Sequence, residues 1–124
     1  MFNKKDLMPK KVFEGNINEK GATKKSWFIG HFMEGPLKTK NFELKWGKHQ
    51  KGEKDTNAES YSKAKTIGIL IYGKFRFEFP GINKKITLSQ EGDYCFYDAG
   101  ISHNWRVLED CLILSIRWPS IPKN

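Results

Sequence analysis

The chain contains the segment Glu91-Gly-Asp-Tyr-Cys-Phe-Tyr-Asp-Ala-Gly-Ile-Ser-His103, in which two glycines and a histidine bracket a short aromatic run. Gly92 suits a tight turn because glycine adopts positive φ without steric cost. The residues from Tyr94 to Tyr97 are typical of a strand, and the Asp98-Ala-Gly stretch is a turn signal. The chain is therefore expected to re-enter a strand at His103, which places its imidazole at the mouth of a sheet cavity. The alternative is a histidine that only forms a hydrogen bond at a strand start.

This spacing resembles the second conserved motif of the cupins, G-x5-P-x-G-x2-H. Gly92, Gly100 and His103 match it, and Asp98 stands where that motif has proline. The resemblance implies a β-barrel whose cavity is the functional site, and it implies a metal-ligating role for the histidine.

The first cupin motif, G-x5-H-x-H-x3,4-E-x6-G, supplies three further metal ligands in that family, and here it is degenerate. Gly52 and Gly73 suit its two ends, but the segment 53–65 contains no histidine. Counting places Ala58 and Ser60 at the two histidine positions and Thr66 at the glutamate position. Transition metals are usually held by three or four imidazole, thiolate or carboxylate groups. We therefore expect no standard metal centre and no cofactor.

A non-standard divalent metal site remains the alternative. A shift of one or two residues in the loop would bring Glu59 or Tyr61 into the ligand region, and the metal set would then be His103, His49 and Glu59. His49 alternates with Glu43 and Lys45, opposite an apolar set formed by Phe42, Leu44 and Trp46. This period of two predicts that His49 lies on the outer face, as a surface residue or dimer contact, unless a bulge at Gly47 turns it inward.

The remainder of the chain is a succession of short strands separated by turn residues, without a helical period. Eight strands are predicted, at Trp27 to Phe32, Asn41 to His49, Thr66 to Tyr72, Phe75 to Phe79, Lys85 to Leu88, Tyr94 to Tyr97, Trp105 to Leu108 and Cys111 to Trp118. Eight antiparallel strands predict an all-β, double-sheet jelly-roll barrel. Over Trp27 to Ser120 the chain resembles small single-domain bacterial cupins of uncharacterised function.

Length and charge indicate one barrel domain, residues 26–124, preceded by a basic arm, residues 1–25. The chain has 124 residues and a net charge of +8, and the arm holds seven lysines against three acidic residues. Such an arm binds nucleic acid or anionic surfaces in some proteins. It lacks arginine and aromatic clusters, so we expect no nucleic-acid binding and interpret the arm as a solvated tail or a segment exchanged with a partner subunit.

The location is predicted to be cytoplasmic, with no membrane association. No apolar run is long enough to span a bilayer, and the lysine-rich start is not followed by a hydrophobic segment. Cys95 and Cys111 lie inside predicted strands without metal-site spacing, which favours buried thiols in a reducing compartment.

Two further patterns bear on the interior. Phe75, Phe77 and Phe79 alternate with charged residues and are predicted to form the core. Arg117 interrupts the apolar last strand, where it either anchors an anionic ligand or, the slightly favoured alternative, pairs with a carboxylate such as Glu43 or Glu78.

The residues expected at the ligand site are His103, Trp105, Tyr72, Tyr61, Glu59 and Arg117. The favoured function is binding of a small polar organic ligand in the barrel without a standard metal centre. One alternative is a metal-dependent or histidine-based enzyme of the isomerase or oxygenase type, with His103 as the catalytic residue. Another is an interaction protein whose barrel is a scaffold for the basic arm. Because small cupins usually pair through sheet edges, a homodimer is expected.

Overall fold

A computed structural model describes residues 12–57 and 62–122 of the chain. The architecture is all-β, as predicted, and the described residues contain no α-helix. Two 3-10 turns, η1 (Gly35–Leu37) and η2 (Pro80–Ile82), lie among seven strands. The strands are β1 (Trp27–Ile29), β2 (Glu43–His49), β3 (Lys54–Asp55), β4 (Lys65–Phe79), β5 (Lys84–Leu88), β6 (Tyr94–Tyr97) and β7 (Asn104–Trp118).

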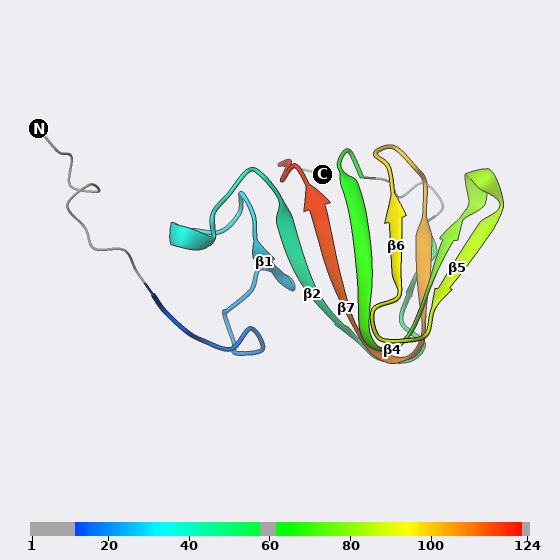
Figure 1. Ribbon diagram of the computed structural model, residues 1–124, viewed down its shortest axis with the longest axis horizontal. Helices are drawn as coiled ribbons and strands as arrows, with labels where there is room; N and C mark the ends of the chain where they lie inside the picture. Colours follow the sequence, from blue (N-terminus) through cyan, green and yellow to red (C-terminus); the bar gives the residue numbers. More distant parts are fainter. Residues whose placement is uncertain (1–11, 58–61, 123–124) are drawn as a thin grey trace, which may run out of the picture.

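Two long strands, β4 and β7, form the spine of the fold. They pair antiparallel from Lys65 opposite Trp118 to Glu78 opposite Asn104, and each continues from one wall of the barrel into the other. The first half of β4 is flanked by β6, and its second half by β5. One wall therefore has the order β1-β2-β7-β4-β6, and the opposite wall has the order β3-β7-β4-β5. Figure 1 shows the two walls rising from the bend that β4 and β7 share. This is the predicted double-sheet jelly roll.

The bend explains why seven strands replace the predicted eight. The pairing register of β4 with β7 shifts between Leu70 and Phe75, and Gly73 within this irregularity has φ of +90°. A side chain at Gly73 would collide with the carbonyl oxygen of Asp110 on β7. The turn residues Gly73 and Glu109-Asp110 thus bend two continuous strands instead of separating four. The two-residue strand β3 was missed, and β1 ends at Ile29, earlier than predicted.

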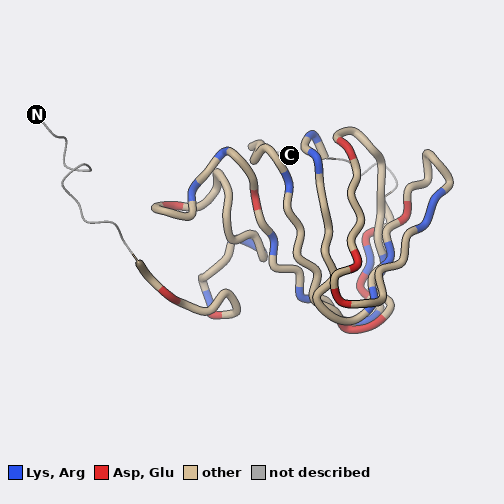
Figure 2. The backbone as a smooth tube through the Cα atoms, in the orientation of Figure 1, with Lys and Arg blue, Asp and Glu red and all other residues tan. Residues whose placement is uncertain are grey.

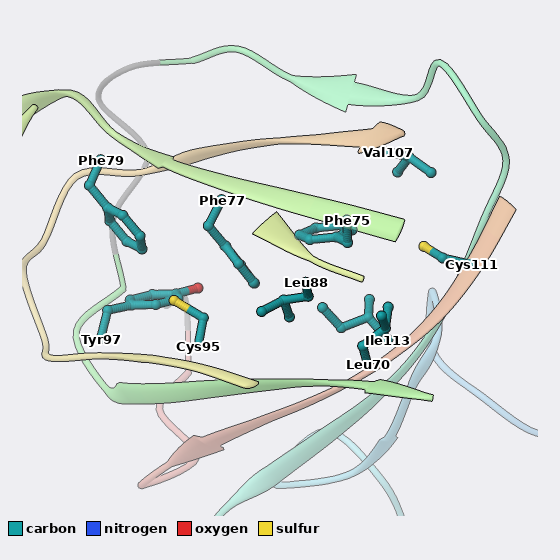
Figure 3. Packing of buried hydrophobic residues seen from close by; sticks show 10 residues of the cluster. All are labelled: Leu70, Phe75, Phe77, Phe79, Leu88, Cys95, Tyr97, Val107, Cys111 and Ile113. Atoms are coloured by element: carbon teal, nitrogen blue, oxygen red, sulfur yellow. The ribbon is translucent and has the colours of Figure 1, made fainter. Parts of the chain in front are cut away.

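The predicted aromatic core is confirmed. Phe75, Phe77 and Phe79 are 3%, 4% and 3% exposed. They point from one wall toward Tyr97 and Cys95 of β6 on the other (Figure 3). β7 is central, between β2 and β4, but in its last part, from Cys111 to Trp118, only Cys111 to Ile113 are buried, and Leu114 to Arg117 are half-buried.

The described part of the amino-terminal segment forms no strand before Trp27. Figure 1 shows its first residues running away from the barrel, and Val12 and Phe13 are exposed. Its link to the barrel includes a hydrogen bond of 3.1 Å, donated by Trp46 Nε1 to Asn18 Oδ1. No helix in the described residues has the length and apolar character needed to cross a bilayer.

Candidate ligand-binding site

A cavity of about 160 Å³ lies between the two walls. The β1-β2-β7-β4-β6 wall presents mainly polar groups to it, from Lys45 and His49 on β2, Thr66 on β4, and Ser115 and Arg117 on β7. These residues share one face because side chains alternate along a strand and Lys45 lies opposite Ser115 in the β2–β7 register.

The opposite wall is aromatic. Phe75 and Phe77 of β4 and Trp105 of β7 line the cavity, and His103 lines it immediately before β7 begins. The rings of Phe75 and Trp105 stack, with centroids 5.4 Å apart and planes at 26°. The cavity thus lies between a polar wall and an aromatic wall, the combination that binds small organic molecules.

His103 is oriented by two hydrogen bonds. Its Nδ1 lies 3.0 Å from the carbonyl oxygen of Ile101, which can only accept, so Nδ1 carries the proton. Its Nε2 lies 3.3 Å from the hydroxyl of Tyr97. Burial raises the pKa of Tyr97 to about 12, so the phenol is protonated at neutral pH. Its hydroxyl group therefore donates a hydrogen bond to Nε2 of His103. Tyr97 is the partner of His103, and the sequence analysis missed it.

His49 lies inside the barrel, so the prediction of an outer-face residue was wrong. Its ring centroid is 5.0 Å from that of Trp105 and 6.1 Å from that of Phe75. The period of two correctly grouped His49 with Lys45, but the face that they share is the inner one. Gly47 leaves space for the ring, because a Cβ at that position would come within 3.2 Å of His49 Nε2.

The surroundings of His49 favour its neutral form. Burial lowers the pKa of His49, and the positive charge of Lys45 lowers it further. The Glu53 carboxylate opposes both effects, with its Oε1 atom 3.6 Å from His49 Nδ1. The net direction is downward, because desolvation is the largest influence.

Arg117 and Lys45 meet at Trp27. The guanidinium carbon of Arg117 lies 4.1 Å from the centroid of the Trp27 ring, and Lys45 Nζ lies 5.6 Å from it. Arg117 Nε is 2.7 Å from Oε1 of Glu43, a charge contact without the alignment of a hydrogen bond. The favoured ion pair with Glu43 is therefore present, and Arg117 also lines the cavity. Burial and the charge of Arg117 lower the pKa of Lys45.

The remaining expected site residues are placed as follows. Trp105 lines the cavity. Tyr72 does not: it is 47% exposed and lies near Lys48 on the outside of the bend, because the shift in register beside Gly73 turns it away. Glu59 and Tyr61 lie outside the described residues.

The sequence analysis missed Lys45 and Trp27 in addition to Tyr97. The alternation along residues 43–49 contained the signal for Lys45, since it links Lys45 to His49. Tyr97 is buried with Cys95, whereas Tyr94 and Phe96 on the other face of β6 are exposed; the sequence analysis assigned no inner face to this strand, so Tyr97 was not recognised.

The described residues do not fit the standard metal centre of the cupins. Within residues 12–57 and 62–122, no group of three or more His, Cys, Asp and Glu side chains is arranged to hold a metal ion. His49 and His103 both line the cavity, but Nδ1 of His103 is engaged by Ile101. We derive no chemical step through a metal at this site.

Solved structures share this architecture. KdgF from Halomonas sp. is similar with a TM-score of 0.57 and 25% identity, over 65% of this chain and 72% of that chain. A cupin superfamily protein from Desulfitobacterium hafniense is similar with a TM-score of 0.57 and 19% identity, over 64% of this chain and 69% of that chain. The protein has a cupin fold.

A third similar structure is a protein of unknown function from Streptococcus pyogenes, with a TM-score of 0.57 and 15% identity, over 66% of this chain and 68% of that chain. No protein-family model matches this chain, and no curated protein matches it. These similarities support the fold, and the chemistry of the site has to be argued from its own residues.

Proposed function

We propose that this cupin binds one small polar organic molecule in the cavity between its two walls, without a standard metal centre. The observation that carries the proposal is the opposition of an aromatic wall to a polar wall across one cavity. The cavity of about 160 Å³ is smaller than the roughly 300–1,000 Å³ of drug-sized sites, so the ligand has the size of a small metabolite.

The two walls offer different kinds of contact to a ligand. The stacked rings of Phe75 and Trp105 offer flat apolar surface to a carbon skeleton or ring. Ser115, Lys45 and His49 face them with groups that form hydrogen bonds to oxygen substituents. Tyr97 and Ile101 hold the ring of His103 in one orientation, so that little freedom is lost when a ligand binds.

The test is native mass spectrometry of protein purified without chelator or affinity metal. We expect a small organic molecule to accompany the chain, and we expect Ser115→Leu, which fills the cavity, to remove it. The control is Thr87→Leu, which also replaces a hydroxyl side chain with leucine, but at an exposed position of β5. Circular dichroism verifies the fold of both variants. Ligand-free wild-type protein that also fails to bind any compound in a metabolite screen would contradict the proposal.

A histidine-based enzyme is the second candidate, and the Tyr97–His103 hydrogen bond favours it. An imidazole held by a phenol at a cavity wall is placed to move a proton to or from a substrate oxygen or carbon, as in an isomerase. Elemental analysis of the same preparations separates this candidate from a metal enzyme. Stoichiometric iron, zinc, manganese or nickel that disappears in His103→Ala would contradict the metal-free proposal.

The interaction-scaffold alternative rests on the basic arm, and residues 1–11 of that arm lie outside the described residues. In the part of the chain that the structure describes, Figure 2 shows Lys and Arg interspersed with Asp and Glu along the backbone, whereas nucleic-acid surfaces typically gather basic residues on one face. The absence of nucleic-acid binding stays a prediction. Cys95 and Cys111 are free and buried, which supports a reducing compartment, and the cytoplasmic location also stays a prediction.

A further inference from the structure

We infer that the ligand is a small organic monocarboxylate, and that Lys45 and Arg117 bind its carboxylate group. This inference rests on the proposed function, because it names the class of molecule that occupies the same cavity. It follows from the charges that line the cavity, from the convergence of two cationic side chains on one ring, and from the engagement of the nearby carboxylate.

The charges on the cavity wall are unbalanced. Lys45 and Arg117 line the cavity together with His49 and His103, and none of its described lining residues is Asp or Glu. Glu43 lies behind Arg117, is 1% exposed, and has both oxygens engaged. Its Oε1 contacts Arg117, and its Oε2 accepts a hydrogen bond of 3.0 Å from Ser120.

Lys45 is therefore the cation without a counter-charge. It forms no ion pair with the described carboxylates, and its close contacts include the face of Trp27. Burial and Arg117 both lower the pKa of Lys45, which means that the surrounding protein disfavours its charged form. A bound anion would offset this cost and would also relieve the effect of Lys45 on His49.

The geometry brings the two cationic groups to one place. Glu43 pairs with Arg117 and Lys45 pairs with Ser115 in the β2–β7 register, so Lys45 and Arg117 are diagonal neighbours on the inner face. Diagonal neighbours are within reach of each other when their side chains are long. Both head groups lie near the Trp27 ring, Arg117 at 4.1 Å and Lys45 at 5.6 Å.

The class of anion follows from charge and shape. One uncompensated positive charge matches a carboxylate with a single negative charge better than a phosphate that carries nearly two. The planar guanidinium fork suits carboxylate oxygens, and the Glu43 contact holds it in place. Ser115 lies opposite Lys45 and is available for a hydroxyl or keto oxygen of the same ligand. The aromatic wall accommodates the carbon skeleton.

The experiment uses matched acid and amide probes on the full chain. Lactate and lactamide, benzoate and benzamide, and inorganic phosphate are titrated while the ring signals of His49 are followed by NMR. We expect each carboxylate to bind about tenfold or more tightly than its amide, because charge-assisted hydrogen bonds are the stronger ones. Binding of a carboxylate should also raise the pKa of His49, which a merely structural lysine would not cause.

Variants at Lys45 and Lys48 test whether the preference for carboxylates over amides depends on Lys45. Lys45→Met should remove the preference for carboxylates, and Lys48→Met should keep it, because Lys48 is an exposed lysine on the outer face of the same strand. Lys45→Gln serves as a second variant if the methionine variant folds poorly. The molecule released from wild-type protein should carry a carboxylate by mass spectrometry.

Each alternative result has a distinct meaning. Equal binding of acids and amides, or a neutral co-purified molecule, would overturn the carboxylate inference and leave the proposed ligand-binding function intact. Tighter binding of inorganic phosphate than of the carboxylates would overturn the choice of monocarboxylate. Ligand-free protein that binds none of the probes would overturn both proposals.

Discussion

His49 is the residue whose surroundings differ most from those that its sequence neighbours indicated. A histidine beside lysines and a glutamate looks solvated, yet its ring packs on Trp105 and Phe75 inside the barrel. A neutral imidazole is tolerated there, whereas a charged one is opposed by burial and by Lys45. The protonation of His49 should therefore be linked to the stability of the fold.

This linkage predicts a loss of stability in mild acid. The pKa of His49 is lower in the folded chain than its value of about 6.5 in the unfolded chain, so the unfolded chain binds more protons below that pH. The part of the folding stability that depends on a neutral His49 is fully present above pH 6.5, and it is lost as the pH falls from 6.5 toward the pKa of His49 in the folded chain. Urea unfolding between pH 7.5 and 5 measures it, and His49→Gln should flatten the profile. An unchanged slope in that variant would refute the assignment.

The continuity of β4 and β7 is the decisive feature among the elements. Each strand belongs to both walls, so the conformation at their bend determines whether the walls face each other. Gly73 allows the bend for two reasons: its φ is +90°, and its α-carbon lies against the backbone of Asp110 and Cys111. Glycine is required where positive φ and close approach coincide.

Gly73→Ala should therefore destabilise the protein by about 3 kcal/mol or more, since strain at positive φ and a steric collision each cost roughly 1–3 kcal/mol. Thermal unfolding measures the effect. The matched control is Gly81→Ala in η2, where an added Cβ would meet nothing within 4 Å and φ is not positive. Equal melting temperatures for the two variants would show that the bend does not depend on Gly73.

On the scale of the whole molecule, the outer face of the β6-β4-β7 region is unusually apolar. Tyr94 and Phe96 are 65% and 45% exposed, and they lie opposite Ile69 and Ile67 of β4. Trp118 of β7 extends this patch, with its ring centroid 6.1 Å from that of Phe96. A contiguous exposed apolar patch on a small protein usually marks an interaction site.

We propose that a second copy of the chain covers this patch in a symmetric homodimer. Light scattering should then give about twice the 14.4 kDa of the chain. Tyr94→Lys combined with Phe96→Lys should shift the mass toward the monomer, because buried unpaired lysines oppose association. Thr87→Lys, on the opposite wall, is the control. A wild-type mass of 14.4 kDa at working concentration would refute the dimer.

The amino-acid sequence by itself determined the fold class and the position of His103. Turn glycines, short apolar runs and strict alternation are local properties, and they specify strands, turns and the phenylalanine core without reference to distant residues. The same local order indicated that His49 and Lys45 share a face. The resemblance to the second cupin motif, and to the glycine at the end of the first, agreed with the strand pattern.

Tertiary structure alone decided which face of each strand meets the cavity. On β6 both faces carry aromatic side chains, and on β2 the polar residues Lys45 and His49 face the cavity, so alternation alone did not distinguish inner from outer. That choice depends on how β4 and β7 bend and on which wall β2 joins, through contacts between distant residues such as Glu43 and Ser120, which are 77 positions apart. Local pattern therefore predicted the barrel, and packing between distant strands placed the cationic and aromatic groups around one cavity.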